Sequence, residues 1–410
     1  MRALLLSVLL MTQAGIAQDV YLRLTDYGGG KINLVVEPFA SGESSLRDEE
    51  ARQITVIEDV LKKDLEYSLY FEIFTDPTFL AEDAQGVILK AQAESQKLSV
   101  RLEDFESREK IGERTYDIED DTRLTAHIIA DDVINLLTGE KGISRTKVLF
   151  SYKTPAGKEI GLIDYDGYNF TRVTNNGNIN LFPSWASDGK RMLFSTYTDD
   201  RLKIYIYDFT EKKMTSLSSF PGLNFAPCWS PDGTKICMSL SKDGNAELYL
   251  LNLDTRKMHR LTNNSAVDTS PAFSPNSREI VFVSDRSGNP QIYVMDTHGG
   301  NVRRLTYHGN YNTSPAWSPR GDIITYVSRE KDNSQQVYVT DPTDFSPVRL
   351  TYLGNNEEPG WSPDGLHIVF TSNRTGRYEL YTMNWDGSRL RRLTNGITAN
   401  APDWSPVTEQ

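Results

Sequence analysis

PCWSPDG, from Pro227 to Gly233, indicates the fold of this 410-residue chain, because close copies of it recur along the C-terminal two thirds. The six copies are PSWASDG from Pro183, PCWSPDG from Pro227, PAFSPNS from Pro271, PAWSPRG from Pro315, PGWSPDG from Pro359 and PDWSPVT from Pro402. Their starts are 44 residues apart, with a last step of 43. A fixed period in this range is typical of a repeat architecture.

Between two copies the sequence follows one plan. In the fourth unit, Glu279–Ser284, Gln291–Asp296 and Val302–Thr306 are apolar, strand-like runs separated by the turn sequences DRSGN and THGG. Together with its heptapeptide, each unit supplies four short strands joined by turns rich in Gly, Asp and Asn. This pattern predicts the blades of an all-β propeller over residues 144–410.

An offset between the two ends of the repeat region predicts the number of blades. The last heptapeptide copy, from Pro402, is followed by almost no sequence, whereas the first three strand-like runs, Val148–Thr174, have no copy before them. Joining the C-terminal strand to this N-terminal set completes a sixth blade. We therefore expect a six-bladed ring closed by strand pairing, which leaves no exposed outer seam.

The aromatic residue of the heptapeptide has a structural explanation. Five of the six tryptophans lie in the copies, and Phe273 takes the same place in the remaining one. Burying such a ring between blades removes roughly 150–250 Å² from water and contributes about 4–6 kcal/mol at most. The aromatic residues are therefore scaffold, and function is expected in the loops.

The N-terminal end has the pattern of an exported protein. Residues 1–17 combine a basic start, an apolar run from Ala3 to Met11 and small residues before Ala17, as in a signal peptide cleaved after Ala17. The apolar run is shorter than the roughly 20 residues of a membrane span. In residues 18–30, Asp19–Asp26 alternates like a strand and is followed by three glycines. This strand either belongs to the edge of the domain's own sheet or adds to a partner's sheet.

Residues 31–143 are expected to form a small α/β domain with two helices on a mixed sheet. A buried strand at Ile32–Phe39 precedes a helix with Ser45 as its N-cap, and a second helix runs from about Asp121 to Leu137 with Gly139 as its C-cap. The expected core positions of the two helices are Ile54, Ile57, Leu61 and Leu65, and Leu124, Ile128, Ile134 and Leu137.

Charge and cysteine content restrict the classes of function. Residues 18–143 hold 28 acidic and 14 basic residues, whereas the remainder from Ser144 is nearly neutral, so nucleic acid is an unsuitable partner. Cys228 and Cys237 are the only cysteines. They face each other if SPDGTK forms a hairpin loop, either as a disulfide of an exported protein or as two small buried residues.

The loops that lead into the inner strands are the candidate binding surface. They precede each heptapeptide and form a ring rich in Asn, Thr and Ser: Asn180–Phe182, Asn224–Ala226, Asp268–Ser270, Asn312–Ser314, Asn356–Glu358 and Ala399–Ala401. Such a ring suits hydrogen-bonded capture of a polypeptide. Asp268, Glu357 and Glu358 are weak calcium candidates, because no ligand motif of defined spacing accompanies them. No cofactor is expected.

Motifs for catalysis are absent from the sequence: it has no Gly-x-Ser-x-Gly elbow, His-Glu-x-x-His, phosphate-binding loop or zinc-type cysteine pair. A non-enzymatic role is therefore expected. The alternatives are an exported propeller enzyme, related to peptidases or lyases, and a carbohydrate-binding propeller with aromatic side chains in the ring, where only Phe182 and Phe225 qualify.

The whole chain resembles the TolB family of periplasmic proteins of the Tol–Pal envelope system. The resemblance is carried by the heptapeptide repeats, by Leu137–Gly139 and Arg145-Thr146 followed by DYDGYN from Asp164, and by VVEPF at Val35–Phe39. It implies a monomeric scaffold that supports outer-membrane integrity and envelope constriction at cell division.

The resemblance also implies two partners and their sites. The C-terminal domain of TolA would bind the N-terminal segment, and the lipoprotein Pal would bind the propeller loops. The TolA-binding residues would be Asp19, Val20, Tyr21, Leu22, Arg23, Leu24, Thr25 and Asp26. The Pal-binding residues would be Leu223, Asn224, Ala226, Asp268, Thr269, Thr313, Glu357 and Glu358.

Overall fold

The computed structural model describes residues 30–41, 48–76, 78, 85–343 and 345–408. The expected signal peptide, the TolA-binding segment Asp19–Asp26 and the expected N-cap Ser45 lie outside the described residues. The chain divides into two compact units after Arg145. No helix in the described part of the chain is both long and apolar enough to cross a membrane.

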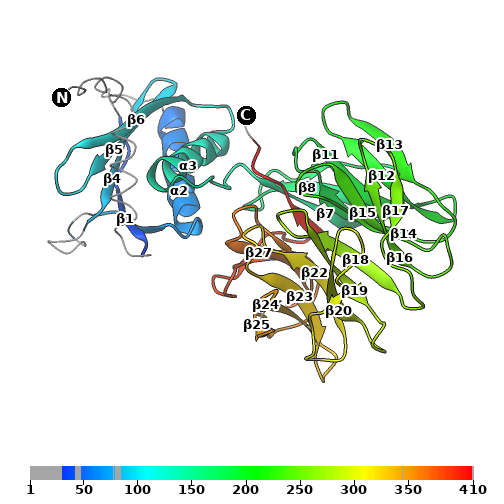
Figure 1. Ribbon diagram of the computed structural model, residues 1–410. Helices are drawn as coiled ribbons and strands as arrows, with labels where there is room; N and C mark the ends of the chain where they lie inside the picture. Colours follow the sequence, from blue (N-terminus) through cyan, green and yellow to red (C-terminus); the bar gives the residue numbers. More distant parts are fainter. Residues whose placement is uncertain (1–29, 42–47, 77, 79–84, 344, 409–410) are drawn as a thin grey trace, which may run out of the picture. The chain divides into compact units, whose positions relative to one another are not determined.

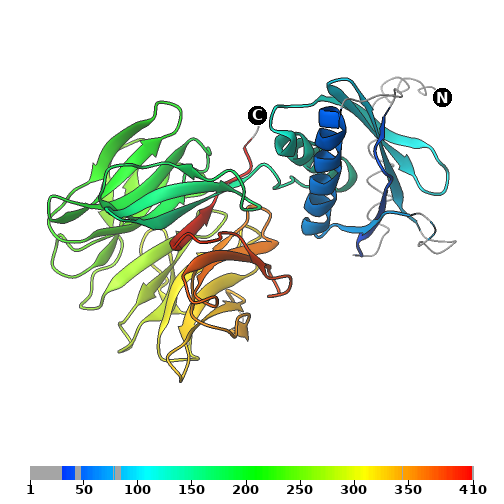
Figure 2. The ribbon, with the colours of Figure 1, turned by 180° about the vertical axis from the view of Figure 1, so that it is seen from behind.

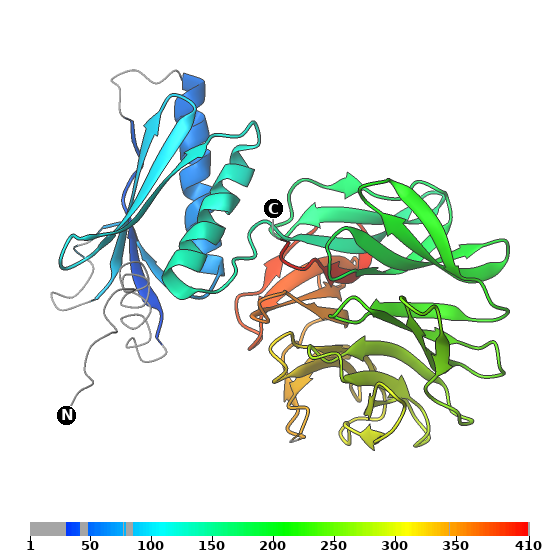
Figure 3. The ribbon, with the colours of Figure 1, turned by 45° about the horizontal axis from the view of Figure 1, so that its top comes forward.

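The N-terminal unit is a mixed sheet covered on one face by two helices. The sheet has the order β3-β1-β4-β5-β6, with β2 also beside β4. β1 pairs in parallel with β3 and β4, whereas β4, β5 and β6 are antiparallel. Figure 3 shows α2 and α3 side by side on the sheet. The elements are β1 (Ile32–Val36), β2 (Ala40–Ser41), α2 (Asp48–Tyr67), β3 (Phe71–Phe74), β4 (Val87–Glu94), β5 (Lys97–Asp104), β6 (Lys110–Asp117) and α3 (Thr122–Thr138).

The apolar stripes of the two helices form this unit's core with alternate residues of the strands. In α2 all four expected core residues are buried. In α3 the prediction is confirmed for Ile134 and Leu137. It is wrong for Leu124, which is 37% exposed, and Ile128 is only half-buried, whereas Ile129 and Val133 are buried instead. The stripe of α3 starts only at Ala126, since Leu124 lies in the first turn beside the Asp121 cap. Gly139 caps the C-terminus in the left-handed conformation, with φ of 74°, as predicted.

The C-terminal unit is a β-propeller, as predicted. Four of its sheets have four strands each, in chain order from the inside outward. They are β14 (Asn224–Trp229), β15 (Lys235–Leu240), β16 (Glu247–Asn252) and β17 (Met258–Arg260); β18 (Asp268–Phe273), β19 (Glu279–Ser284), β20 (Gln291–Asp296) and β21 (Arg303–Arg304); β22 (Asn312–Trp317), β23 (Ile324–Arg329), β24 (Gln335–Thr340) and β25 (Val348–Arg349); β26 (Asn356–Trp361), β27 (His367–Ser372), β28 (Glu379–Asn384) and β29 (Arg391–Arg392).

The remaining strands form one sheet of eight, in which the two ends of the unit meet. Its order is β13-β12-β11-β10-β8-β7-β30, with β9 beside β8. β10 and β8 are joined at a single residue pair, Ile179 with Lys158. The strands are β7 (Lys147–Thr154), β8 (Gly157–Asp164), β9 (Thr171–Arg172), β10 (Ile179–Trp185), β11 (Arg191–Thr198), β12 (Arg201–Asp208), β13 (Lys213–Ser218) and β30 (Ala399–Trp404).

The last strand, β30, pairs antiparallel with β7, about 250 residues earlier in the chain. Figures 1 and 2 show β30, in red, beside the green-cyan β7. Trp404 lies opposite Val148 and is only 5% exposed. Its indole Nε1 donates a hydrogen bond of 2.8 Å to the Thr146 hydroxyl, so the side chain fastens the end of the unit to its start.

The heptapeptide itself is scaffold. Trp229 is 6% exposed and packs with residues of the preceding sheet, while Arg191 lies over its ring. In the following turn the Ser230 hydroxyl accepts the Lys235 N–H at 2.9 Å, and Gly233 has a φ of 70°, which favours glycine.

The two cysteines are register partners across β14 and β15. Both are free thiols, and burial raises the pKa of each. Of the two alternatives left by the sequence, the structure therefore has the one in which Cys228 and Cys237 pack as small apolar residues.

Candidate functional site

Each of the six inner strands contains the same bulge at the position of the ring. The three residues before each heptapeptide proline are called the ring triplet. In β18, Thr269, the second residue of its triplet, faces Val283, and Ala272, the residue after the proline, faces Val281. Two residues thus separate the pairs on β18 and only one separates them on β19, so the inner strand has one extra residue. The same shift occurs in β10, β14, β22, β26 and β30. A bulge of this kind re-aims side chains and is frequent next to functional sites.

The third ring residue takes the left-handed conformation in every copy, although none is a glycine. The φ values are 51° at Phe182, 45° at Ala226, 52° at Ser270, 52° at Ser314, 53° at Glu358 and 50° at Ala401. Such a backbone costs about 1–3 kcal/mol per residue and persists only where the surrounding structure imposes it. In each of the six strands, the hydrogen-bonded pairing on both sides of the bulge imposes the left-handed conformation on this residue.

These six residues surround a funnel of about 150 Å³ in the propeller unit. The prolines that follow them and one further residue, Asp403, complete the lining: Phe182, Pro183, Ala226, Pro227, Ser270, Pro271, Ser314, Pro315, Glu358, Pro359, Ala401, Pro402 and Asp403. Phe182 and Phe225 meet edge to face with ring centroids 4.6 Å apart, which makes one side of the ring apolar. Glu358 and Asp403 add two carboxyl groups to the lining.

Two carboxyl groups of the funnel hold their protons more tightly than usual. Burial raises the pKa of Asp403 from 3.8 to about 7, against the opposing effect of the Trp185 N–H, which donates to Oδ2 at 2.6 Å. Burial also raises the pKa of Glu358, although the Ala401 N–H donates to its Oε2 at 2.6 Å. A carboxyl in low dielectric prefers its neutral form. The funnel is therefore less negative near neutral pH than its sequence indicates.

The predicted Pal-binding residues differ in their position relative to the funnel. Ala226 and Glu358 line the funnel, and Thr269, Thr313 and Glu357 are half-buried beside it. Asn224 and Asp268 are fully buried, and their contact with a partner stays a prediction. Leu223 lies outside the funnel lining, where its N–H donates to the Ser241 hydroxyl.

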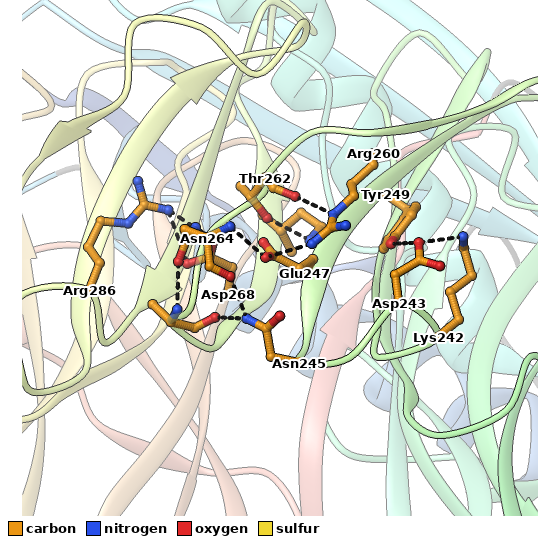
Figure 4. Close-up of polar contacts among 12 residues, drawn as sticks. Lys242, Asp243, Asn245, Glu247, Tyr249, Arg260, Thr262, Asn264, Asp268 and Arg286 are labelled. Carbon is orange, nitrogen blue, oxygen red and sulfur yellow. Dashed lines mark hydrogen bonds and ion pairs between the residues drawn. The ribbon is translucent and has the colours of Figure 1, made fainter.

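In five of the six ring triplets the first residue is Asn or Asp, and its side chain holds the preceding loop by hydrogen bonds, as Figure 4 shows for Asp268. The Arg286 guanidinium donates to both oxygens of Asp268, at 3.1 and 2.9 Å, and the Asn264 amide donates to Oδ2 at 2.8 Å. Buried charges are tolerated when they are paired in this way. Asp268 is thus a structural residue because its acceptors are already used within the blade.

A second buried carboxylate, Glu247, holds the start of the same loop (Figure 4). It accepts hydrogen bonds from Arg260 at 3.0 Å and from the Asn264 N–H at 2.8 Å. The arrangement recurs elsewhere, where Glu159 pairs with Arg172 and Glu379 pairs with Arg392. These bonds fix the loops that position the ring.

The calcium candidates do not form a site. Among the described residues no group of three or more His, Cys, Asp and Glu side chains is arranged to hold a metal ion. Asp268 is paired with Arg286, Glu357 accepts the Tyr378 hydroxyl at 3.0 Å, and Glu358 accepts the Ala401 N–H. Their oxygens serve three separate protein donors.

The loops expected to form the ring already contain the funnel residues Ser270 and Ser314, whereas the funnel residue Asp403, which follows the heptapeptide proline, lies outside those loops. Asp403 stands where the other copies have Ser, Cys, Ala, Ala and Gly, so a carboxyl there breaks a pattern of small residues.

Comparison with known proteins agrees with this architecture. Residues 134–407 match the family described as "TolB beta propeller domain", which is well over half of the chain. The chain belongs to the TolB family. The resemblance stated from the sequence is thereby confirmed.

Relatives and solved structures show how far the likeness of this TolB-family chain extends. It is 33% identical over 197 residues to the Tol-Pal system protein TolB of Desulfosudis oleivorans, covering 42% of this chain and 44% of that protein. For TolB of Geobacter sulfurreducens the identity is 36% over 87 residues, which are 21% of this chain and 20% of that protein. These alignments thus span less than half the length of the relatives.

The crystal structure of TolB from Acinetobacter baumannii covers more. It matches 92% of this chain and 97% of its own with a TM-score of 0.77 and 25% identity. A propeller in a nidogen/laminin complex matches 63% of this chain and 98% of its own with a TM-score of 0.54 and 11% identity, which shows a shared fold alone.

Proposed function

We propose that this protein is a periplasmic, non-enzymatic scaffold that captures the lipoprotein Pal at the propeller funnel and the C-terminal domain of TolA through its N-terminal segment. In this role it supports outer-membrane integrity and envelope constriction at cell division. The observation that carries the Pal site is the ring of six left-handed residues around the funnel. Membership of the TolB family supports the choice of partners.

We infer that the propeller has six blades and a closed ring. The eight-stranded sheet divides naturally at the single pair between β10 and β8. One part, β10 to β13, then has four strands in chain order, as each of the four separate sheets does. The other part, β7, β8 and β9, obtains its inner strand from β30. The recurrence of the bulge in all six inner strands supports this division.

The chemistry of the funnel suits a polypeptide rather than a reaction. Its lining offers hydroxyl groups, proline rings, the Phe182 ring that packs against Phe225, and two carboxyl groups whose pKa is raised by burial. Bulges and pre-proline residues keep the lining rigid, and a preorganised surface loses little entropy on binding. Capture of Pal would be linked to the state of the N-terminal segment, and that linkage must be reciprocal in free energy.

The double substitution Ala226→Glu and Thr269→Glu tests the Pal site. Two added carboxylates would be buried without partners, so we expect the affinity for Pal of the same organism to fall at least about tenfold. Titration calorimetry of the mature protein measures this. Thr255→Glu, in the exposed turn after β16, is the control and should leave the affinity unchanged. Equal affinities for the double variant and the wild type would place the Pal interface elsewhere.

Deletion of residues 18–30 tests the TolA site. We expect binding to the TolA C-terminal domain to be lost, because strand addition needs the backbone of this segment. The melting temperature should stay nearly unchanged if the segment is not an internal strand of the domain. A melting temperature lowered by many degrees would instead identify residues 18–30 as a fixed part of the sheet.

A further inference from the structure

A second hollow lies outside the funnel, where the start and the end of the propeller unit meet. It has a volume of about 450 Å³ and is lined by Tyr152, Lys153, Phe170, Arg377, Gly396, Ile397 and Thr398. The Lys153 N–H donates to the Thr398 carbonyl at 2.9 Å, so the β7 strand and the loop before β30 form a continuous wall. Thr398 directly precedes the ring residues Ala399–Ala401.

The hollow has an apolar floor. Phe170 is 44% exposed and meets Tyr152 edge to face, with ring centroids 5.3 Å apart. Ile397 is half-buried beside them. An exposed phenylalanine held at a fixed angle by a buried tyrosine is a preformed contact for an apolar side chain.

Two cations stand at the rim without acidic partners. Lys153 and Arg377 are exposed, and neither forms an ion pair with any residue that the structure describes. Arg377 Nη1 donates to the Gly396 carbonyl at 2.8 Å, which holds the guanidinium beside the hollow while its other N–H groups stay available. The equivalent turns of two other sheets have asparagine at the position of Arg377, namely Asn245 and Asn289.

The carboxylate nearest in sequence does not cancel this charge. Glu379 is 1% exposed and already accepts Arg392 at 2.6 Å and the Gly396 N–H at 2.7 Å. Arg377 and Lys153 therefore give the hollow a net positive rim over an apolar floor.

We propose that this hollow docks an acidic peptide segment that carries an apolar side chain between carboxylates. The apolar side chain would occupy the floor against Phe170, and the flanking carboxylates would accept charge-assisted hydrogen bonds from Lys153 and Arg377. The hollow adjoins the ring through Thr398, so it would serve as a second binding site for a polypeptide beside the funnel. Peptide binding in the hollow does not depend on which protein the funnel binds.

A peptide fits these features better than an anionic membrane does. Docking to acidic lipids needs clusters of about four to eight cations, each contributing about 1 kcal/mol, whereas this rim offers two. A membrane surface also cannot reach into a concave site formed by two loops. The charge complementarity and the apolar floor together match a short acidic segment.

The test uses the whole mature protein and two fluorescein-labelled peptides, Asp-Glu-Phe-Glu-Asp and its reversed-charge counterpart Lys-Lys-Phe-Lys-Lys. By fluorescence anisotropy, we expect the wild type to bind the acidic peptide and not the basic one. Lys153→Glu with Arg377→Glu should weaken the acidic peptide at least about tenfold and create binding of the basic peptide. Phe170→Ala should weaken the acidic peptide severalfold.

Matched controls separate this proposal from a general charge effect. Lys331→Glu changes an exposed cation in the β23–β24 turn and should leave peptide binding unchanged. No binding by the wild type at millimolar peptide, equal binding by the charge-reversed variant, or binding of phosphatidylglycerol vesicles instead of the peptide would each overturn the proposal. Retained Pal capture by the Lys153/Arg377 variant would leave the funnel assignment intact, so the two proposals fail separately.

Discussion

Asp403→Asn is expected to raise the free energy of unfolding of the propeller at about pH 8 by up to about 4 kcal/mol. The carboxyl has an ordinary pKa of 3.8 and a folded-state pKa of about 7, because burial disfavours its charged form. An unfolded chain thus releases this proton near pH 4, whereas the folded protein keeps it until about pH 7. The contribution of the protonated Asp403 carboxyl to the free energy of unfolding is therefore fully present below about pH 4 and is lost as the pH rises through about 7.

The size of this expected change in unfolding free energy follows from the shift in the pKa of Asp403, since each pKa unit corresponds to about 1.4 kcal/mol. Asparagine keeps an oxygen that can accept the Trp185 N–H but cannot ionise. Below about pH 4 the variant should therefore gain nothing, and it should lose some stability because the new amide N–H groups are half-buried beside the funnel. The expected result is a stability curve for the variant that is flatter than that of the wild type and crosses it between pH 4 and 7.

Urea unfolding followed by circular dichroism at several pH values measures this difference. Asp243→Asn is the control of opposite sign, because hydrogen bonds from Lys242 and then Tyr249 lower the pKa of Asp243. Replacing it should not stabilise the protein at any pH. Parallel curves for Asp403→Asn and the wild type would show that Asp403 titrates normally and is open to water.

Trp404→Ala is expected to destabilise the propeller unit by about 3–5 kcal/mol, the usual cost of removing a buried aromatic ring. Trp404 is 5% exposed, lies in β30 opposite Val148, and donates to the Thr146 hydroxyl. The substitution leaves a cavity where the last strand meets the first, and it leaves Thr146 without that donor. If β30 closes the ring, unfolding of the Trp404→Ala propeller should therefore be less cooperative as well as require less free energy.

The matched control makes the same chemical change on the surface. Trp385 is 43% exposed in the turn after β28, so Trp385→Ala should change the unfolding free energy by less than about 0.5 kcal/mol. Circular dichroism during urea unfolding compares the two variants without relying on tryptophan emission. If Trp404→Ala were no more destabilising than Trp385→Ala, pairing of β30 with β7 would not close the propeller.

The binding residues show the limit of reading side chains from a repeat. The family resemblance implies that Asn224 and Asp268 belong to the Pal surface, and both stand in loops of the ring. In the fold they are fully buried, since a polar residue at the start of the inner strand satisfies the loop behind it. The arginine that binds Asp268, Arg286, is 18 residues away in another turn, and nothing local in the sequence links the two.

From the sequence alone we can predict the propeller, its period, the aromatic scaffold positions and the α/β character of the first unit. Period, turn residues and apolar alternation are local properties, and they repeat often enough to be read directly. Which ring residues face the funnel depends on the folded arrangement of the strands and could not be predicted in the same way. The heptapeptide and its ring triplet contain a bulge, and one extra residue in a strand reverses the face of every side chain beyond it. That choice depends on the hydrogen-bonded register with the neighbouring strand, so Ser270 and Asp403 line the funnel while Asp268 lies behind it.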